Sequence, residues 1–250
     1  MYAPPSNMVV NPTAQLVVTV IQITAAVIAT VWVTRGQKGH ELLLRVLVLV
    51  GGGASVLFEP FGDRLGMIWH ASVGQWTILH HYGHFVPVWM LATYYWFCGG
   101  QTLYVIQRFR NGASAGELWK LYWIFVVMDA LLEIPVLWFT DVYTYFGDQP
   151  FWWPPYFPLP AWYLVLNGLL PLAAGRAALY MLDFGKPVYL WLIPLVIPMS
   201  LFAVYAATAW PVWAALNSDA SSVTRYLAGA LTVALGLLTA HLLTSSPVRE

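Results

Sequence analysis

The feature that most restricts the fold of this chain is a series of apolar runs, each about 20 residues long. The runs lie at about 15–34, 41–60, 84–106, 117–139, 159–182, 188–210 and 223–245. An α-helix of this length crosses the roughly 30 Å hydrocarbon core of a bilayer. The sequence therefore predicts an all-α fold, in which residues 1–250 form one polytopic membrane bundle of seven transmembrane helices.

The composition also indicates a membrane protein. Hydrophobic residues make up 60% of the chain and charged residues only 9%, whereas about a quarter of the residues of a soluble domain are charged. The formal net charge is zero, so nothing favours nucleic acid as a partner. We expect a multi-pass protein of the cell membrane whose first partner is the lipid bilayer.

The basic residues predict the orientation of the bundle. Those that flank the first, third and fifth connections or end the chain are Arg35, Lys38, Arg45, Arg108, Arg110, Lys120, Arg176, Lys186 and Arg249. Only Arg64 and Arg225 fall on the opposite side. Because cytoplasmic loops are enriched in Lys and Arg, the N-terminus is expected outside and the C-terminus in the cytoplasm. The first run has no basic segment before it, so we expect it to stay in the mature protein.

Three acids interrupt apolar segments. Asp129 and Glu133 lie four residues apart, on one face of the fourth predicted helix, and Glu59 closes the second. An ionisable side chain at membrane depth costs about 2.5 to 3.5 kcal/mol, so such residues usually face a polar cavity. The alternative is a structural function, in which the acids pair with Arg64 or with backbone donors and hold helices together.

Two long connections, 61–83 and 140–158, lie on the predicted outer side and are rich in aromatic residues, proline and glycine. Aromatic side chains favour the headgroup level of a membrane, and proline and glycine interrupt helices. We expect both connections to form structured caps over the helix ends. Asp63, Asp141 and Asp148 lie in these caps, so the acids are expected to gather at or just below the outer surface.

Four histidines, His70, His80, His81 and His84, lie in one outer connection and at the start of the third run. The pattern His-His-x-x-His resembles the histidine boxes of membrane di-iron desaturases, but six histidines in the whole chain are too few for such a site. A single zinc ion held by three imidazoles and a carboxylate remains an alternative. Interfacial histidines more often form hydrogen bonds or titrate, so no metal ligand is assigned.

Other common kinds of site have little support in the sequence. Cys98 is the only cysteine, which excludes an internal disulfide and a cysteine pair for metal or redox chemistry. There is no Gly-rich phosphate loop.

Acids beneath aromatic rings favour a different chemistry. A protonated carboxyl group can protonate an alkene or an epoxide, and aromatic faces stabilise the resulting cation by roughly 0.5 to 2 kcal/mol each. We therefore expect Asp129 and Glu133 to act as proton donor and partner, with Glu59 opposite them. The side chains expected to bind a lipophilic substrate are His84, Trp89, Tyr145, Trp152, Trp153 and Trp162.

Seven helices, with Glu59 near the end of the second and further acids facing it, resemble the integral-membrane terpene cyclases of meroterpenoid and indole-terpenoid pathways. Those cyclases usually have Trp before this Glu, where this chain has Phe58. The segment from Glu133 through Tyr145 to Trp162 is also similar to membrane proteins of carotenoid biosynthesis, including hydratases. Both resemblances imply a lyase or isomerase of isoprenoid biosynthesis that performs acid-initiated cyclisation or hydration and needs no cofactor.

Three other functions remain open. A proton-coupled transporter would use Asp129 and Glu133 as a relay. A seven-helix receptor matches the predicted topology, but the last two predicted helices contain no lysine for a retinal Schiff base. A scaffold subunit would present the acids to a partner helix.

Overall fold

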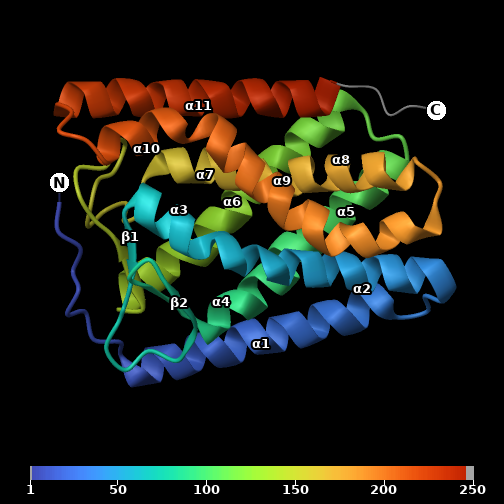
Figure 1. The fold of residues 1–250 in the computed structure, drawn as a ribbon, viewed down its shortest axis with the longest axis horizontal. Coiled ribbons are helices and arrows are strands. Elements are labelled where there is room, and N and C mark those ends of the chain that lie inside the picture. Colours follow the sequence, from blue (N-terminus) through green and yellow to red (C-terminus); the bar gives the residue numbers. More distant parts are fainter. Residues whose placement is uncertain (1, 246–250) are drawn as a thin grey trace.

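The computed structural model describes residues 2–245. Its long helices lie side by side along the longest axis of the molecule (Figure 1). The chain begins with α1 (Pro12–Thr34), and α2 (Gly39–Ala54) continues through a 3₁₀ turn into α3 (Glu59–Gly66). Next, α4 (Val88–Thr93) continues through a π-helical turn into α5 (Gly99–Arg110). The remaining helices are α6 (Ala115–Phe139), α7 (Ala161–Asn167), α8 (Leu170–Leu182), α9 (Ile193–Thr208), α10 (Trp210–Leu216) and α11 (Ser222–Ser245).

Six helical runs are long and apolar enough to cross a membrane. They are Pro12–Thr34, Gly39–Gly66, Ala115–Phe139, Ala161–Leu182, Pro187–Thr208 and Ser222–Ser245. Each matches a predicted run to within a few residues, except that the second continues to Gly66. The structure therefore confirms a helical bundle with the spans of a multi-pass membrane protein.

The predicted run at 84–106 differs from the other six. Its first residues form strand β3 (His84–Pro87), and the helix begins only at Val88. From there the chain is helical as far as Arg110, but this helix is not among the six apolar runs. Tyrosines at 94 and 95 and polar residues from Gln101 onward make it less apolar. A seventh span thus remains a prediction.

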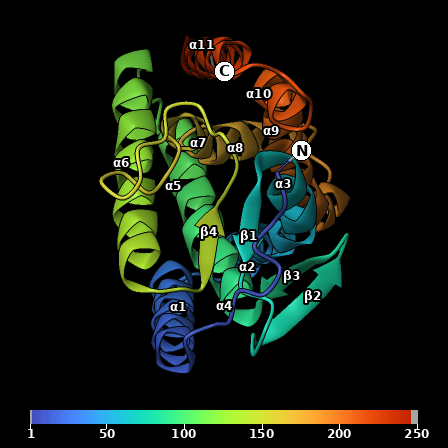
Figure 2. The same ribbon diagram turned by 90° about the vertical axis from the view of Figure 1, so that its left-hand side faces the viewer.

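The two connections predicted as caps are joined by β-structure, which the expectation of an all-α fold did not include. Strand β1 (Ile68–His70) pairs antiparallel with β4 (Tyr143–Tyr145), with His70 opposite Tyr143. The other pair is the hairpin of β2 (Thr77–His81) and β3, and Figure 2 shows both pairs at one end of the bundle. Backbone groups outside the helices satisfy each other across these strands. The first cap begins at Met67 rather than at residue 61, because α3 extends the second helix.

Glycines allow close contact between helices in the opposite half of the bundle. A Cβ atom added to Gly52 would lie 2.5 Å from the Cα atom of Gly99, and one added to Gly175 would lie 2.5 Å from Val105 Cγ1. These approaches join α2 to α5 and α5 to α8. Small residues at such crossings let backbones pack directly against each other.

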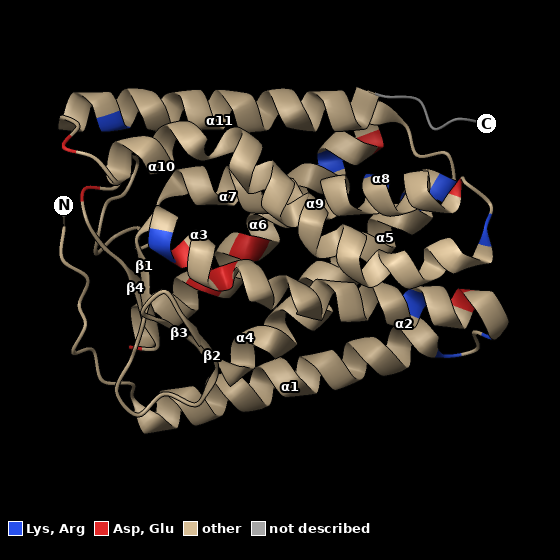
Figure 3. Cartoon of the chain, in the orientation of Figure 1, with Lys and Arg blue, Asp and Glu red and all other residues tan. Residues whose placement is uncertain are grey.

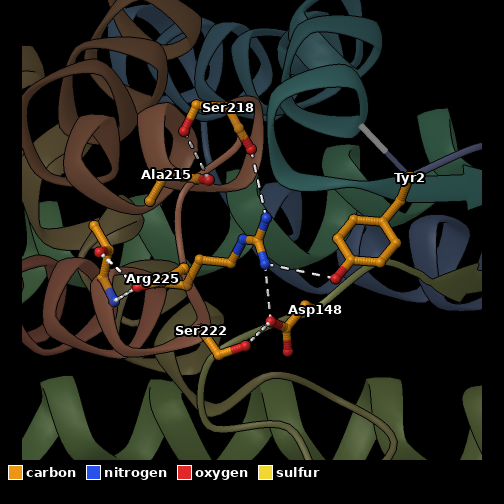
Figure 4. Close-up of polar contacts among 8 residues, drawn as sticks. Tyr2, Asp148, Ala215, Ser218, Ser222 and Arg225 are labelled. Atoms are coloured by element: carbon orange, nitrogen blue, oxygen red, sulfur yellow. Dashed lines mark hydrogen bonds and ion pairs between the residues drawn. The ribbon is translucent and has the colours of Figure 1, made fainter.

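Figure 3 shows Lys and Arg gathered at one end of the bundle and several Asp and Glu residues in its interior, nearer the capped end. Arg225 is an exception at the capped end. Its guanidinium donates hydrogen bonds to Asp148 Oδ2 at 2.9 Å and to the Ser218 carbonyl at 3.4 Å (Figure 4). It also contacts the Tyr2 hydroxyl, and Ser222 donates to Asp148. This cluster ties the N-terminal segment and the second cap to the start of α11.

Candidate active site

Glu133, near the C-terminal end of α6, is the centre of a hydrogen-bond network. Its Oε2 atom accepts hydrogen bonds from Tyr143 at 2.9 Å and from Tyr145 at 3.0 Å. Its Oε1 atom lies 3.3 Å from the amide nitrogen of Asn167. The tyrosines come from β4 and the amide from the end of α7, so three elements position this carboxyl group.

Asp129 lies one turn from Glu133 on the same face of α6 and is buried. Asn167 Nδ2 donates to Asp129 Oδ2 at 2.7 Å as well as to Glu133. The hydroxyl of Tyr205, from α9, donates in turn to Asn167 Oδ1. The amide of Asn167 therefore bridges the two acids and is itself held by a tyrosine.

Glu59 reaches the same region from the start of α3. Its Oε2 atom accepts a hydrogen bond of 2.5 Å from Tyr94, in the π-helical turn between α4 and α5. A π-helical turn inserts one extra residue into a helix and often marks a functional position. The turn presents the Tyr94 hydroxyl to Glu59.

Two cavities meet at these acids. One is lined by residues of α4 and α6, and we call it the α4 cavity. The other is lined by residues of α3 and α9, and we call it the α9 cavity. Glu59, Tyr94, Glu133, Tyr145 and Asn167 line both. The hydrogen-bonded acids thus form the partition between two spaces.

The partners of the acids are neutral. No Lys or Arg among the described residues lines either cavity. Arg64 is exposed, and within residues 2–245 it forms no ion pair with an acid. The alternative in which Arg64 neutralises the acids is therefore not what the structure shows.

The histidines of the first cap divide into two buried and two exposed residues. His70 Nδ1 lies 3.2 Å from Asp63 Oδ2, and His84 Nδ1 lies 4.0 Å from the same atom. Burial lowers the pKa of His70 to about 4, and burial followed by the charges of His70 and Arg64 does the same for the pKa of His84. Both imidazoles are therefore neutral at pH 7. His80 and His81 are exposed on β2, so the described residues do not assemble a site of three imidazoles.

The tyrosines that contact Glu133 act as donors. Burial, followed by the charge of Glu133, raises the pKa of Tyr143 and of Tyr145 well above the ordinary range. Both side chains therefore keep their hydroxyl hydrogen atoms at neutral pH. The β1–β4 pairing holds these two tyrosines in place.

The structure brings the three predicted catalytic acids, Asp129, Glu133 and Glu59, to the α4 cavity, together with Trp89 and Tyr145. The other residues expected to bind substrate line neither cavity. His84 lies beside Asp63, and Trp152 donates to the Pro158 carbonyl. Trp153 is exposed, and Trp162 stacks on Tyr163.

Several residues of the site were not predicted from the sequence. Asn167, Tyr94, Tyr143 and Tyr205 complete the hydrogen bonds of the acids. Asn167 offered one signal, since it is a lone amide within an apolar run, where polar side chains usually face a partner. Asp63 and His70 also lie at the site and are considered below.

No family model, curated protein or solved structure matches this chain.

Proposed function

We propose that this protein is a membrane enzyme that performs acid-initiated cyclisation or hydration of a lipophilic, isoprenoid substrate. The observation that carries the proposal is the acid pair of α6. Asp129 and Glu133 share one amide donor and face Glu59 in a cavity that no described Lys or Arg lines. Two adjacent carboxyl groups with no cation to neutralise them do not readily ionise together, so the pair can hold a transferable proton.

In the proposed reaction, the carboxyl group of the Asp129–Glu133 pair transfers its proton to an alkene carbon or an epoxide oxygen of the substrate. The cation that forms on carbon is stabilised by the aromatic faces of Trp89 and Tyr145, which line the α4 cavity. In cyclisation a second double bond of the substrate adds to the cation, and Glu59 accepts the proton that is then lost. In hydration a water molecule adds instead and gives its proton to the carboxylate left by the Asp129–Glu133 pair.

After cyclisation the proton on Glu59 must return to the Asp129–Glu133 pair, and the enzyme is then unchanged overall. Cyclisation returns one proton to the protein for each proton delivered, and hydration consumes only water. No redox or group-transfer step is part of it. General acid catalysis of this kind typically contributes about 100-fold to 10,000-fold in rate.

The proposed setting is the cell membrane, with seven spans, the N-terminus outside and the helix Val88–Arg110 as the seventh. The separation of basic residues supports this orientation (Figure 3). A cysteine label at residue 112 should react only after the cells are permeabilised, and one at residue 148 should react in intact cells. These labels are placed in a chain whose Cys98 is replaced by Ser. The reverse pattern would overturn the orientation.

Incorporation of solvent deuterium tests the chemistry. The purified protein is incubated in detergent and D₂O with prenyl alkenes and terminal epoxides of several chain lengths. Mass spectrometry of the products should show one deuterium for each protonated alkene, or an epoxide-derived product of unchanged or water-increased mass. Absence of any product with each of these substrates, together with proton flux in liposomes that depends on Asp129, would instead identify a transporter.

A further inference from the structure

Three potential metal ligands converge where α3 meets the first cap. Glu59 and Asp63 lie one turn apart on α3, and Met67, in the left-handed conformation, ends that helix. The chain then reverses into β1, which brings His70 back beside Asp63. One donor atom each from Glu59, Asp63 and His70 can be chosen so that all lie within 4.8 Å of one another.

The buried polar atoms here are not fully paired. Asp63 is completely buried, and among the described residues its Oδ1 atom has no hydrogen-bond partner. His70 is 2% exposed and its Nε2 atom is also unpartnered, as is Nδ1 of the buried His84. Leaving a buried polar group unpaired costs roughly 1 to 3 kcal/mol, and more for a charged group. A ligand that binds several of these atoms would remove this cost and stabilise the folded protein.

The donor set fits a divalent transition-metal ion. Two carboxylates and a neutral imidazole are ligands of Zn²⁺, Mn²⁺ and Fe²⁺. With bonds of about 2.1 Å, the donor atoms of a tetrahedral site lie about 3.4 Å apart. The observed spread of 4.8 Å therefore closes around an ion with small side-chain movements. Tyr94 contacts only one oxygen of Glu59, which leaves the other oxygen for an ion.

The position of this cluster links the two cavities. His70 lines the α4 cavity, Asp63 lines the α9 cavity, and Glu59 lines both. An ion with three protein ligands keeps at least one open coordination position, as catalytic zinc sites do. Here that position would face the space where a substrate lies.

We propose that Glu59, Asp63 and His70 bind one divalent transition-metal ion in the partition between the α4 and α9 cavities. The sequence analysis assigned no metal or cofactor, and the proton transfer proposed for Asp129 and Glu133 does not require one. The inference therefore goes beyond the proposed function. With the ion bound, Glu59 coordinates it through one carboxylate oxygen while Tyr94 donates to Oε2, and the proton lost in cyclisation then returns to the Asp129–Glu133 pair instead.

Metal content of the full chain tests this site without any substrate. The protein is purified in detergent, treated with a chelator, and dialysed against Zn²⁺, Mn²⁺ or Co²⁺. We expect one ion per chain, measured by plasma mass spectrometry, and a visible absorption band for the Co²⁺ form. Metal binding should also raise the melting temperature, because a ligand that binds only the folded state stabilises it.

Matched variants identify the ligands. Asp63→Asn and His70→Ala should each weaken binding by at least about 100-fold, since loss of an outer-shell partner alone costs 10-fold to 100-fold. His80→Ala removes an imidazole from the same cap but from an exposed position, and should bind metal as the unmodified chain does. The melting temperature of the metal-free variants shows whether each still folds.

Two results would overturn the proposal. One is a chelator-treated protein that takes up less than a tenth of an ion per chain with every metal. The other is a folded His70→Ala or Asp63→Asn variant that binds as tightly as His80→Ala. The two proposals can fail separately. A metal-loaded protein without turnover would contradict the proposed function but not this metal site. Turnover by the metal-free protein would support the acid chemistry whether or not the metal site exists.

Discussion

The run of α2 and α3 and the run of α4 and α5 pack against each other in two different ways along their length. Gly52 and Gly99 bring α2 and α5 into direct backbone contact. Toward the caps, Glu59, about two turns beyond Gly52, and Tyr94, five residues before Gly99, extend from the same two runs and form a hydrogen bond at the wall between two cavities. Close packing in one half fixes the helices, so that polar groups in the other half are held in position without filling the space between them.

This comparison predicts that the two halves respond differently to mutation. Substitutions at the acids of the cavity half should remove activity and leave the fold intact. Substitutions at the glycine contacts should weaken the fold and affect activity mainly through the amount of folded protein.

The largest effect is expected at the acid pair of α6. Glu133→Gln or Asp129→Asn should lower turnover of an isoprenoid substrate by about 100-fold to 10,000-fold, because an amide keeps the shape of the side chain but cannot deliver a proton. The melting temperature should change little, since the amide oxygen still accepts hydrogen bonds. Product formation and thermal unfolding of the same purified samples provide the two measurements.

Asp141→Asn is the control for these variants, because Asp141 is an exposed acid of the second cap and its loss should not alter turnover. The assignment would be wrong if the amide variants misfold while their folded fraction keeps full activity. In that case Asp129 and Glu133 serve the structure rather than the reaction.

The next largest effect is expected at the glycine contact. In Gly52→Ala the new Cβ atom would lie 2.5 Å from the backbone of Gly99 and 2.8 Å from the carbonyl oxygen of Tyr94. Since backbone atoms cannot move aside as a side chain does, α2 and α5 must separate, at a cost of about 1 to 3 kcal/mol. Thermal unfolding in detergent measures the loss, and activity per folded molecule should change far less.

Gly100→Ala is the matched control, because it lies next to Gly99 on α5 and a Cβ atom there would meet nothing within 4 Å. Alanine is also the better helix former, by about 1 kcal/mol, so this variant should be as stable as the unmodified chain or more so. Equal destabilisation by the two substitutions would show that helix contact at Gly52 is not what stabilises this half.

A smaller effect is expected from the aromatic lining. Trp89→Leu should lower turnover by about 2-fold to 30-fold, because one ring supplies roughly 0.5 to 2 kcal/mol to a desolvated cation. Trp153→Leu should have almost no effect, since Trp153 is 53% exposed and lines neither cavity. Steady-state kinetics of both variants provide the test, and an equal loss in both would argue against cation stabilisation within the α4 cavity.

The sequence predicts the apolar spans well because the thickness of a bilayer requires them. It also groups Asp129, Glu133 and Glu59, since an acid in an apolar helix needs a polar environment, and the structure places all three at one cavity. Their hydrogen-bond donors were harder to predict. Tyr94 and Tyr205 are tyrosines in a chain that has fourteen, most of which have no special position in the sequence.

The histidines of the first cap were also hard to place from the sequence. His70 and His80 differ little as sequence positions, but His70 is buried and pairs opposite Tyr143, whereas His80 lies on an exposed hairpin. Only the register of β1 with β4, two strands more than 70 residues apart in the chain, separates them. The extension of the second helix as far as Gly66, which places Asp63 beside His70, is likewise a matter of tertiary packing rather than of apolar periodicity.

The smallest effect is expected at the Arg225 cluster of the capped end, where Asp148 contacts Arg225 outside both cavities. The hydroxyl of Ser222, followed by the guanidinium of Arg225, holds the pKa of Asp148 below its usual value of 3.8. A carboxyl group whose pKa is lower in the folded state stabilises the fold above its unfolded pKa, and this contribution is lost as the pH falls through the folded pKa. The melting temperature of the unmodified chain should therefore exceed that of Asp148→Asn by a small margin at pH 7, and the margin should shrink as the pH falls below about 4 and through the lower folded pKa. Salt should reduce the margin at pH 7, because the ion pair is partly exposed. A margin that grows as the pH falls would show that Asp148 is stabilised in its protonated form, which would contradict the contacts of this cluster.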